Sequence, residues 1–376
     1  MILKIYFLAL VLLLITTVFL PKGKFLILKT NLAQPDLEKD FYWNPKLLFI
    51  LFLFGLFAAL RDTSIGTDYP AYTEFYEHIL NNGKFQSGQL LGIEPGWHYV
   101  NLFFGKLGIP SSIFFGLVTV FTWAFFIKGS YNFQHLLPLM FFFVLSTGFF
   151  FWTLSGLRQS ISIMIFFYAI KFLKENNLFR YVISITFASF FHISIILMLP
   201  YYFLRNLKYN RNVSIALFVI SLGFVGENLF IPIVENALLS LGSTDYLLSY
   251  IGYLEEVEKM EIVEKTGTNL GFLLTTIFTI FILLRGEKTL QRYPEFNIYY
   301  VLFVFYAILN NIFFGVGVIS RLFLYCYICF PVVAAIHTYS SRSIFEKLVS
   351  LSFLLAFGLF YLVTAYKFLL ISLTHI

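Results

Sequence analysis

Charged residues are scarce in this chain of 376 residues, of which 12% are charged and 59% are hydrophobic. Soluble domains carry about 25% charged residues, so the composition excludes an ordinary soluble globular protein. Long apolar runs recur along the whole sequence, which predicts a membrane protein that crosses the bilayer many times. A formal net charge of +6 in such a protein does not indicate a nucleic-acid partner, and the informative property is which loops carry the lysines and arginines.

Cysteine is nearly absent, and the two that occur, Cys326 and Cys329, lie in one apolar stretch, "YCYICF". Without further Cys or His residues at ligand spacing, they predict packing residues and exclude a disulfide framework or a metal site. The sequence also lacks a DxD, an HExxH and a nucleotide-binding P-loop. An enzyme of this kind therefore needs no metal or other cofactor and takes a donor that is already activated, such as a lipid diphosphate.

The apolar runs are long enough to predict about 11 to 12 transmembrane helices in one all-α domain covering 1–376. The first run is followed by "PKGK" without a small-residue cleavage site, so it predicts a retained anchor. A further stretch at 97–109 is interrupted by Lys106, Gly108 and Pro110, and it predicts an interfacial or re-entrant segment. The predicted spans lie near 2–20, 47–60, 110–127, 136–152, 154–173, 180–204, 213–232, 268–284, 297–317, 319–338 and 348–371.

Lysines and arginines concentrate in the linker 21–46 and in the turns near 171–180, 205–211, 285–292 and 342–347, which are therefore predicted to be cytoplasmic. The loops 61–96 and 233–267 are mostly acidic and are predicted to be external. Both ends of the segment 180–204 are basic. A single crossing would place one of these basic ends outside, against the preference of lysine and arginine for cytoplasmic loops. A helical hairpin or broken helix, with its tip near "FFHIS" at 190–194, restores the alternation.

In this topology Arg61, Arg158, Arg321 and His192 all lie at the outer face. Burying a lone guanidinium in hydrocarbon costs at least roughly 2.5 kcal/mol, so each arginine needs a polar environment. Gln159 and the neighbouring serines make most of the helix circumference polar at the level of Arg158, which predicts a wet cavity there. For a single arginine, however, snorkelling to the interface is an equally good explanation.

Clustered arginines match the oxygens of a lipid pyrophosphate, and a histidine or carboxylate supplies the base that a sugar hydroxyl needs. Tyr69, Tyr72 and Trp97 in the first external loop offer flat surfaces for sugar rings. Structural explanations remain open for several of these residues. His192 is a candidate for a purely structural role, Asp68 and Glu94 for turn caps, and Asn311 for an interhelical hydrogen bond.

Five motifs occur in order: "RDTSIGTDYPAYTEF" at 61–75, "EPGWHYVN" at 94–101, "LRQSIS" at 157–162, "FHIS" at 191–194 and "SRLFLY" at 320–325. Over roughly residues 45 to 340 the chain thereby resembles the EpsG-type branch of the Wzy polysaccharide polymerases, which build O-antigen, capsule or exopolysaccharide. The resemblance implies a fold like that of the GT-C glycosyltransferases and O-antigen ligases, with a cavity on the external face.

The resemblance also implies a reaction at the outer face of the bacterial inner membrane. A growing glycan would pass from undecaprenyl pyrophosphate to a new lipid-linked repeat unit, with a Wzz-like chain-length regulator as a further possible partner. Arg61, Arg158 and Arg321 would hold the pyrophosphates, and His192, or else Asp68 or Glu94, would act as the base. Gln159 and Tyr325 belong to the same motifs and are assigned to substrate binding with them.

Two alternatives compete with the polymerase. An O-antigen ligase moves a finished glycan to a different acceptor, but ligases usually show one dominant external loop, and here two loops share the acidic and aromatic residues. A lipid-linked oligosaccharide flippase needs a charged path through the membrane and typically repeated halves. The arginines are predicted on one side and no internal repeat is visible, so both alternatives rank below the polymerase.

Overall fold

The computed structural model describes residues 44–61, 66, 68–83, 94–225, 270–314 and 317–340, together with single positions 346, 348, 352 and 356. Within these ranges every regular element is a helix. The chain divides into two compact units, unit 1 (1–202 and 343–376) and unit 2 (203–342). The predicted spans 2–20 and 348–371 and the loop 233–267 lie wholly or mostly outside the described residues.

Several described helices are long and apolar enough to cross a membrane. Three of them, Ser111–Gly129, Pro294–Ile312 and Arg321–Ser340, qualify singly, and the pair Tyr131–Ser146 and Phe149–Ser155 qualifies together although it bends by 65°. Three shorter apolar helices add to them. The protein is therefore all-helical in its described part, as predicted, with the helices of a multi-pass membrane protein; the total of 11 to 12 helices stays a prediction.

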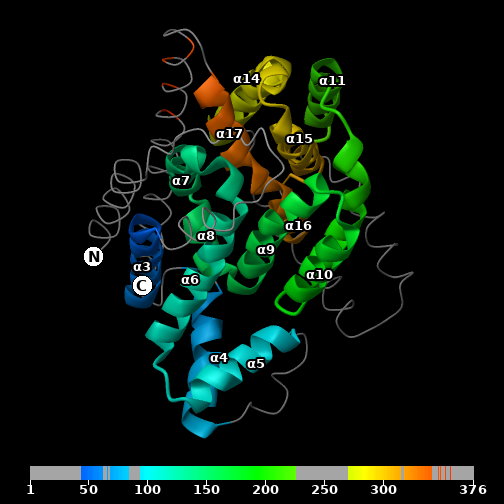
Figure 1. Cartoon of the computed structure of the whole chain (residues 1–376). Helices are drawn as coiled ribbons and strands as arrows, with labels where there is room; N and C mark the ends of the chain where they lie inside the picture. The colour runs from blue at the N-terminus through cyan, green and yellow to red at the C-terminus, as the bar shows by residue number, and fades with distance from the viewer. Residues whose placement is uncertain are drawn as a thin grey trace. The chain divides into compact units, whose positions relative to one another are not determined.

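Unit 1 is built around α6 and α9 (Figure 1). The helix α3 packs on one side of α6 through two glycines, because a Cβ on Gly116 would lie 2.9 Å from the carbonyl oxygen of Gly55. The elements of unit 1 are α3 (Pro45–Leu60), α4 (Tyr69–Asn82), α5 (Pro95–Lys106), α6 (Ser111–Gly129), η1 (Tyr131–Leu136), α7 (Leu137–Ser146), α8 (Phe149–Ser155), α9 (Leu157–Lys174), α10 (Leu178–Ser189) and the first part of η2 (Ile193–Asn206).

Aromatic rings fill the core of unit 1. The ring of Phe54 meets those of Trp123, Phe141 and Phe150 at centroid distances of 5.1, 5.6 and 4.6 Å. The first two contacts are edge-to-face, a geometry that aromatic pairs favour. Among the described residues, eight phenylalanines outside this core are exposed on the helices, where lipid is the expected surrounding.

Two glycines set the helix boundaries in this region: the break at Gly148 falls inside the predicted span 136–152, and the break at Gly156 falls close to the predicted start of the span 154–173. Gly148, in the left-handed region at φ 73°, separates α7 from α8, and Gly156 at ψ 58° separates α8 from α9. The predicted helix 154–173 therefore begins only at Leu157. Each break leaves backbone carbonyls without an intrahelical partner, and the break at Gly156 contributes directly to the site described below.

The segment 180–204 is also interrupted. Asn177 caps α10 by accepting a hydrogen bond from the backbone of Arg180, and the α-helix ends at Ser189. The 3₁₀-helix η2 then begins at Ile193, so that His192 lies in the intervening turn. The interruption falls where the sequence places the hairpin tip, while the depth of that tip in a membrane stays a prediction.

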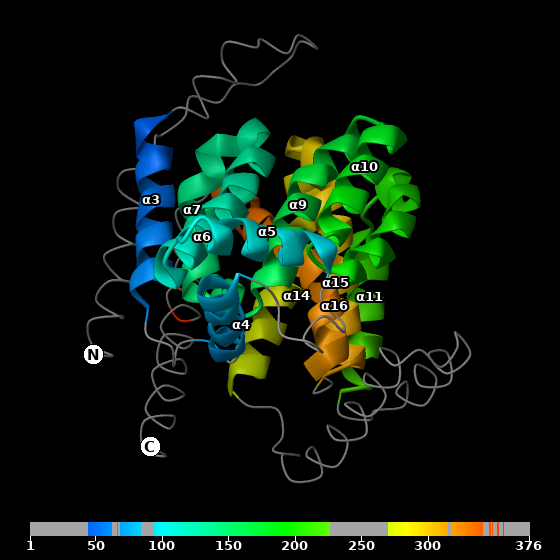
Figure 2. The same ribbon diagram turned by 90° about the horizontal axis from the view of Figure 1, so that it is seen from below.

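Unit 2 contains α11 (Arg211–Leu222), α14 (Leu270–Arg292), η3 (Pro294–Phe296), α15 (Asn297–Ile312), α16 (Gly317–Tyr327) and α17 (Cys329–Ser340), and α15 packs against α11, α16 and α17 (Figure 2). Within it Asn311 donates from Nδ2 to Oγ of Ser221 at 2.9 Å, a buried bond between α15 and α11. The interhelical explanation for Asn311 is thus confirmed. Cys326 and Cys329 are buried, as packing residues are.

Candidate active site

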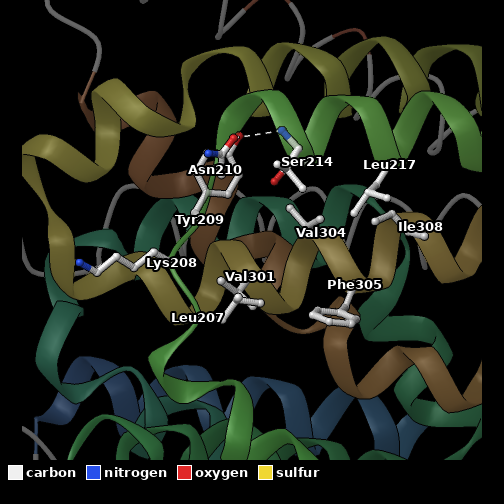
Figure 3. A pocket seen from close by; sticks show the side chains of 11 residues that line it. Leu207, Lys208, Tyr209, Asn210, Ser214, Leu217, Val301, Val304, Phe305 and Ile308 are labelled. Carbon is white, nitrogen blue, oxygen red and sulfur yellow. Dashed lines mark hydrogen bonds between the residues drawn. The ribbon is translucent and has the colours of Figure 1, made fainter.

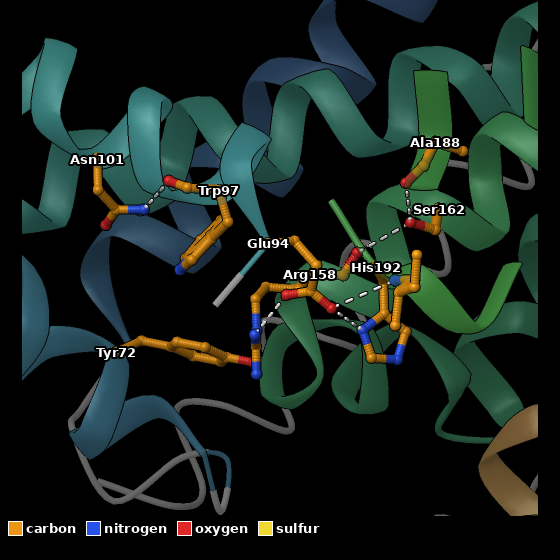
Figure 4. Close-up of polar contacts among 9 residues, drawn as sticks. Tyr72, Glu94, Trp97, Asn101, Arg158, Ser162, Ala188 and His192 are labelled. Atoms are coloured by element: carbon orange, nitrogen blue, oxygen red, sulfur yellow. Dashed lines mark hydrogen bonds and ion pairs between the residues drawn. The ribbon is translucent and has the colours of Figure 1, made fainter. Parts of the chain in front are cut away.

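The side chains of Arg158 and His192, from distant parts of unit 1, both contact the carboxylate of Glu94 (Figure 4). The Oε2 atom of Glu94 accepts from Nη1 of Arg158 at 2.5 Å, and its Oε1 atom lies 2.9 Å from Nδ1 of His192. Oε1 also accepts from the backbone N–H of Ile193 at 3.3 Å. The residues lie at the start of α5, in the first turn of α9 and in the turn after α10, so only the fold brings this cluster together.

Local sequence explains why Glu94 is available. Pro95 occupies the first turn of α5, which holds Glu94 in the extended conformation at ψ 142°. The carboxylate makes no capping hydrogen bond to its own helix. The capping explanation offered for Glu94 is therefore wrong, because both carboxylate oxygens are committed to Arg158, His192 and the backbone of Ile193.

The surroundings keep Glu94 ionised. Burial, which leaves its side chain 7% exposed, by itself raises the pKa of the carboxyl. The hydrogen bond from His192 and the positive charge of Arg158 outweigh burial, so the pKa falls below its usual value. A carboxylate with a lowered pKa holds a proton weakly, which makes Glu94 a poor general base and a good partner for a neighbouring cation or N–H group.

The contact fixes the tautomer of His192 when its imidazole is neutral. An ionised carboxylate only accepts hydrogen bonds, so Nδ1 must carry the hydrogen that points to Oε1. The lone pair then lies on Nε2, on the side of the ring away from Glu94 (Figure 4). With its side chain 16% exposed, His192 can offer this atom to a bound molecule.

Arg158 uses two different nitrogens. While Nη1 contacts Glu94, Nε donates to the hydroxyl oxygen of Tyr72 at 3.5 Å, and the guanidinium carbon lies 5.9 Å from the Tyr72 ring centre. Tyr72 in turn packs edge-on against Trp97, at 5.4 Å between ring centres. Burial is the main cause that raises the pKa of Tyr72, so its phenol is neutral and ties α4 to the first turn of α9.

Two backbone contacts hold the cluster in place. The N–H of Gly96 donates to the carbonyl oxygen of Phe190 at 2.8 Å, and a Cβ at Gly96 would lie only 2.6 Å from that oxygen. The hydroxyl of Ser162 and the backbone N–H of His192 both donate to the carbonyl of Ala188, at 2.8 and 3.2 Å. The start of α5 and the face of α9 are thus both fastened to the turn that carries His192.

Arg61 contacts the neighbouring helix break. Its Nη1 donates to the carbonyl of Leu154 at 2.5 Å, and the guanidinium stacks on the Tyr69 ring at 3.5 Å. The side chain is 8% exposed, and its Nε and Nη2 atoms have no hydrogen-bond partner among the described residues. Burial lowers its pKa to about 10, so Arg61 remains a cation at neutral pH with two unused donors.

The break at Gly156 lies between the residue that Arg61 contacts and Arg158 itself. Leu154, the partner of Arg61, and Arg158 lie four residues apart across it. Ser155, the residue after Leu154, also approaches the loop after α3, since its hydroxyl accepts from the backbone N–H of Asp68 at 3.4 Å. Arg61 therefore contacts the chain just before this break and Arg158 lies just after it, while their joint action in one site stays a prediction. Asp68 occupies the N-cap position of α4, but its side chain makes no capping hydrogen bond, so the capping explanation fails for Asp68 as it does for Glu94.

Two of the aromatic predictions need correction. Tyr69 is 4% exposed and Trp97 is 1% exposed, so neither ring offers an open face to a sugar. Arg61 covers Tyr69, and Trp97 packs between Tyr72 and Phe114. The sequence signal was aromatic content alone, which does not separate packing residues from binding residues.

Three further predicted residues differ in exposure. Gln159, the neighbour of Arg158 in α9, is 6% exposed. Arg321 and Tyr325 lie in α16 of unit 2, where Arg321 is exposed and Tyr325 is buried. The convergence of Arg321 with the cluster in unit 1 stays a prediction, as do the binding roles of Gln159 and Tyr325.

Sequence reasoning missed the contact made by Gly96. The motif "EPGWHYVN" indicates a turn at Pro95 and Gly96, yet the requirement at Gly96 is close approach to another backbone. The partner, Phe190, lies in a separate motif, so no local pattern reveals the pairing.

Comparison with known proteins adds one match. The family model described as the EpsG family matches residues 46–374. No curated protein and no solved structure matches the chain. The matched range contains every residue of the cluster, including Glu94, Arg158 and His192.

Proposed function

The chain belongs to the EpsG family, and on this premise we propose that it is a polysaccharide polymerase of the Wzy type. It transfers a growing glycan from undecaprenyl pyrophosphate to the non-reducing end of a new lipid-linked repeat unit. The reaction takes place at the outer face of the bacterial inner membrane, in a GT-C-like fold. The observation that carries the proposal is the cluster of Arg158, Glu94 and His192, because it combines a cation, an ionised carboxylate and an oriented imidazole.

His192 is the best-placed base among the three residues that the sequence left open. Its Nε2 atom takes the proton from the acceptor hydroxyl as that oxygen attacks the anomeric carbon of the donor. Glu94 holds the ring by its Nδ1–H and stabilises the imidazolium that forms, as a carboxylate partner does in other His-based sites. His192 ranks above Asp68 because its imidazole is held directly by the Glu94 carboxylate.

Arginines stabilise the leaving group. When the bond between the anomeric carbon and the phosphate oxygen breaks, the lipid diphosphate departs with the bonding electrons and gains negative charge. Arg61, whose Nε and Nη2 atoms have no hydrogen-bond partner among the described residues, and Arg158 meet that charge, and Arg321 is proposed as a third phosphate ligand. Preorganised donors at the position where charge develops supply one of the largest contributions to catalysis.

A reconstitution experiment tests the reaction class. The purified full-length protein is incubated with one defined lipid-pyrophosphate oligosaccharide, without metal or nucleotide sugar, and the products are separated by size. A ladder of repeat units is the expected result. A single transfer to a different acceptor would identify a ligase, and unchanged substrate that has only crossed the bilayer would identify a flippase; either result overturns the proposal.

Gly96→Ala tests the backbone contact that positions the site. The added Cβ lies 2.6 Å from the Phe190 carbonyl oxygen, so α5 and the His192 turn must separate. A misplacement of about 1 Å can cost about a hundredfold in rate, and we expect ladder formation to fall by 10- to 100-fold. Gly105→Ala in the same helix is the matched control, because its Cβ has its close contact with a side-chain methyl, Cγ2 of Ile79 at 2.7 Å, and meets the backbone carbon of Ile79 only at an ordinary 3.7 Å. Equal rates in the two variants would show that the contact does not position the site.

A further inference from the structure

Basic side chains gather at one end of the helices of unit 2. The described part of this unit contains seven lysines and arginines, and six lie in the connection before α11, at its first residue or in the last two turns of α14. Hydrogen bonds join these segments, since the backbone N–H of Arg211 donates to Glu287 in α14 and that of Tyr209 donates to Asn297 in α15. The six residues are Arg205, Lys208, Arg211, Arg285, Lys288 and Arg292.

This cationic end faces the cytoplasm in the predicted topology, because lysine and arginine accumulate in cytoplasmic loops. Only two acidic residues, Glu287 and Glu295, accompany it in the described part of unit 2. The cytoplasmic leaflet carries anionic lipids, and basic pockets between transmembrane helices at that level bind their headgroups.

An apolar groove opens at the same end, between α11 and α15 (Figure 3). Its cavity volume is about 160 Å³. Buried Val301 and Val304 of α15 form its floor, and Val213 and Leu217 of α11, 55% and 47% exposed, form one wall. The α15 helix belongs to a segment long and apolar enough to span a membrane, so the groove runs along a surface that hydrocarbon chains contact.

The loop at the closed end of the groove is fixed, and it presents a lysine. Asn297 donates to the carbonyl of Leu207 at 2.7 Å and accepts from the N–H of Tyr209 at 2.9 Å. Between these two anchored residues, Lys208 extends outward past the end of the groove (Figure 3), and its ammonium has no hydrogen bond or ion pair with any described residue. A loop anchored by two hydrogen bonds thus places the Lys208 ammonium beside an apolar groove.

We propose that this groove binds one anionic phospholipid of the cytoplasmic leaflet. One acyl chain lies along α11 and α15 against Val301, Val304 and Leu217, and the phosphate meets the ammonium of Lys208. A phospholipid fits better than the polyprenyl diphosphate of the proposed reaction, because the groove lies at the cytoplasmic end whereas the reaction is placed outside. The proposal therefore stands independently of the proposed function.

Native mass spectrometry of the purified full-length protein tests the site. The protein is exposed to phosphatidylglycerol or phosphatidylcholine with identical acyl chains, and the bound lipid is counted. Wild type is expected to retain phosphatidylglycerol about fivefold better, the effect of one basic side chain at an anionic surface, and Lys208→Gln should remove that preference. Leu217→Trp, at the half-exposed wall, should lower the retention of both lipids, as should Val304→Trp at the floor.

Two variants serve as matched controls. Lys288→Gln removes a charge from the same cationic end, and Val219→Trp adds a ring to an exposed position of α11 (51% exposed) outside the groove. Both should bind lipid as wild type does. Equal retention of the two lipids by wild type, or a Lys288→Gln loss as large as that of Lys208→Gln, would overturn the proposal. Unchanged binding in a folded Leu217→Trp protein would overturn it too.

Discussion

His192→Ala is expected to lower the rate of glycan transfer by about 10² to 10⁴, the range that a positioned general base contributes. The side chain is the only part of the cluster that holds a lone pair directed away from Glu94 (Figure 4). Its loss removes the proton acceptor and leaves the arginines in place. Polymer length in cells and ladder formation by the purified protein measure the effect, and binding of the lipid-linked oligosaccharide should persist.

A second histidine variant controls for nonspecific damage. His78→Ala removes an imidazole that, among the described residues, bonds to Asn82 in its own helix in an exposed setting, and it should leave the rate unchanged. Chains of normal length from His192→Ala would remove His192 from the reaction.

Glu94→Gln separates a positioning role from a base. An amide keeps the shape but loses the charge that steadies the imidazolium, so the rate should fall less than in His192→Ala. The double variant should be no slower than His192→Ala alone, because residues that act as a unit show non-additive effects. A double variant far slower than either single variant would show that the two side chains act separately.

Arg158→Lys should abolish long chains, with a loss of about a hundredfold or more, while the protein stays folded in the membrane. Arginine contacts Glu94 through Nη1 and Tyr72 through Nε, at positions set by a rigid planar fork. A single ammonium keeps the charge but cannot reach both partners in that geometry. Size analysis of the polymer, with immunoblotting of the membrane fraction, measures the outcome.

Arg180→Lys in α10 is the matched control for this substitution. Arg180 is exposed, and its backbone, not its guanidinium, makes the capping bond with Asn177. It should polymerise normally. Long chains made by Arg158→Lys would show that charge alone is sufficient at this position and that the fork has no function there.

Composition and hydrophobic pattern determined the class of the protein. Scarce charge and repeated apolar runs require helices, because lipid leaves backbone groups no partner except one another. The same reasoning singled out Arg158, since a guanidinium with Gln159 and serines around it is poorly placed against hydrocarbon. The family resemblance drawn from five motifs is confirmed by the match over residues 46–374.

Only the tertiary structure decided which polar groups meet. Glu94 is separated from Arg158 by 64 residues and from His192 by 98, and no spacing rule connects such positions. The close approach of Gly96 to Phe190, the helix break at Gly156 and the burial of Tyr69 and Trp97 depend equally on long-range packing. A hydrogen bond acts over about 3 Å, whereas sequence pattern places a helix only to within a few residues. Whether a carboxylate acts as a base or as the partner of a histidine depends on positions at the hydrogen-bond scale, which sequence pattern does not predict.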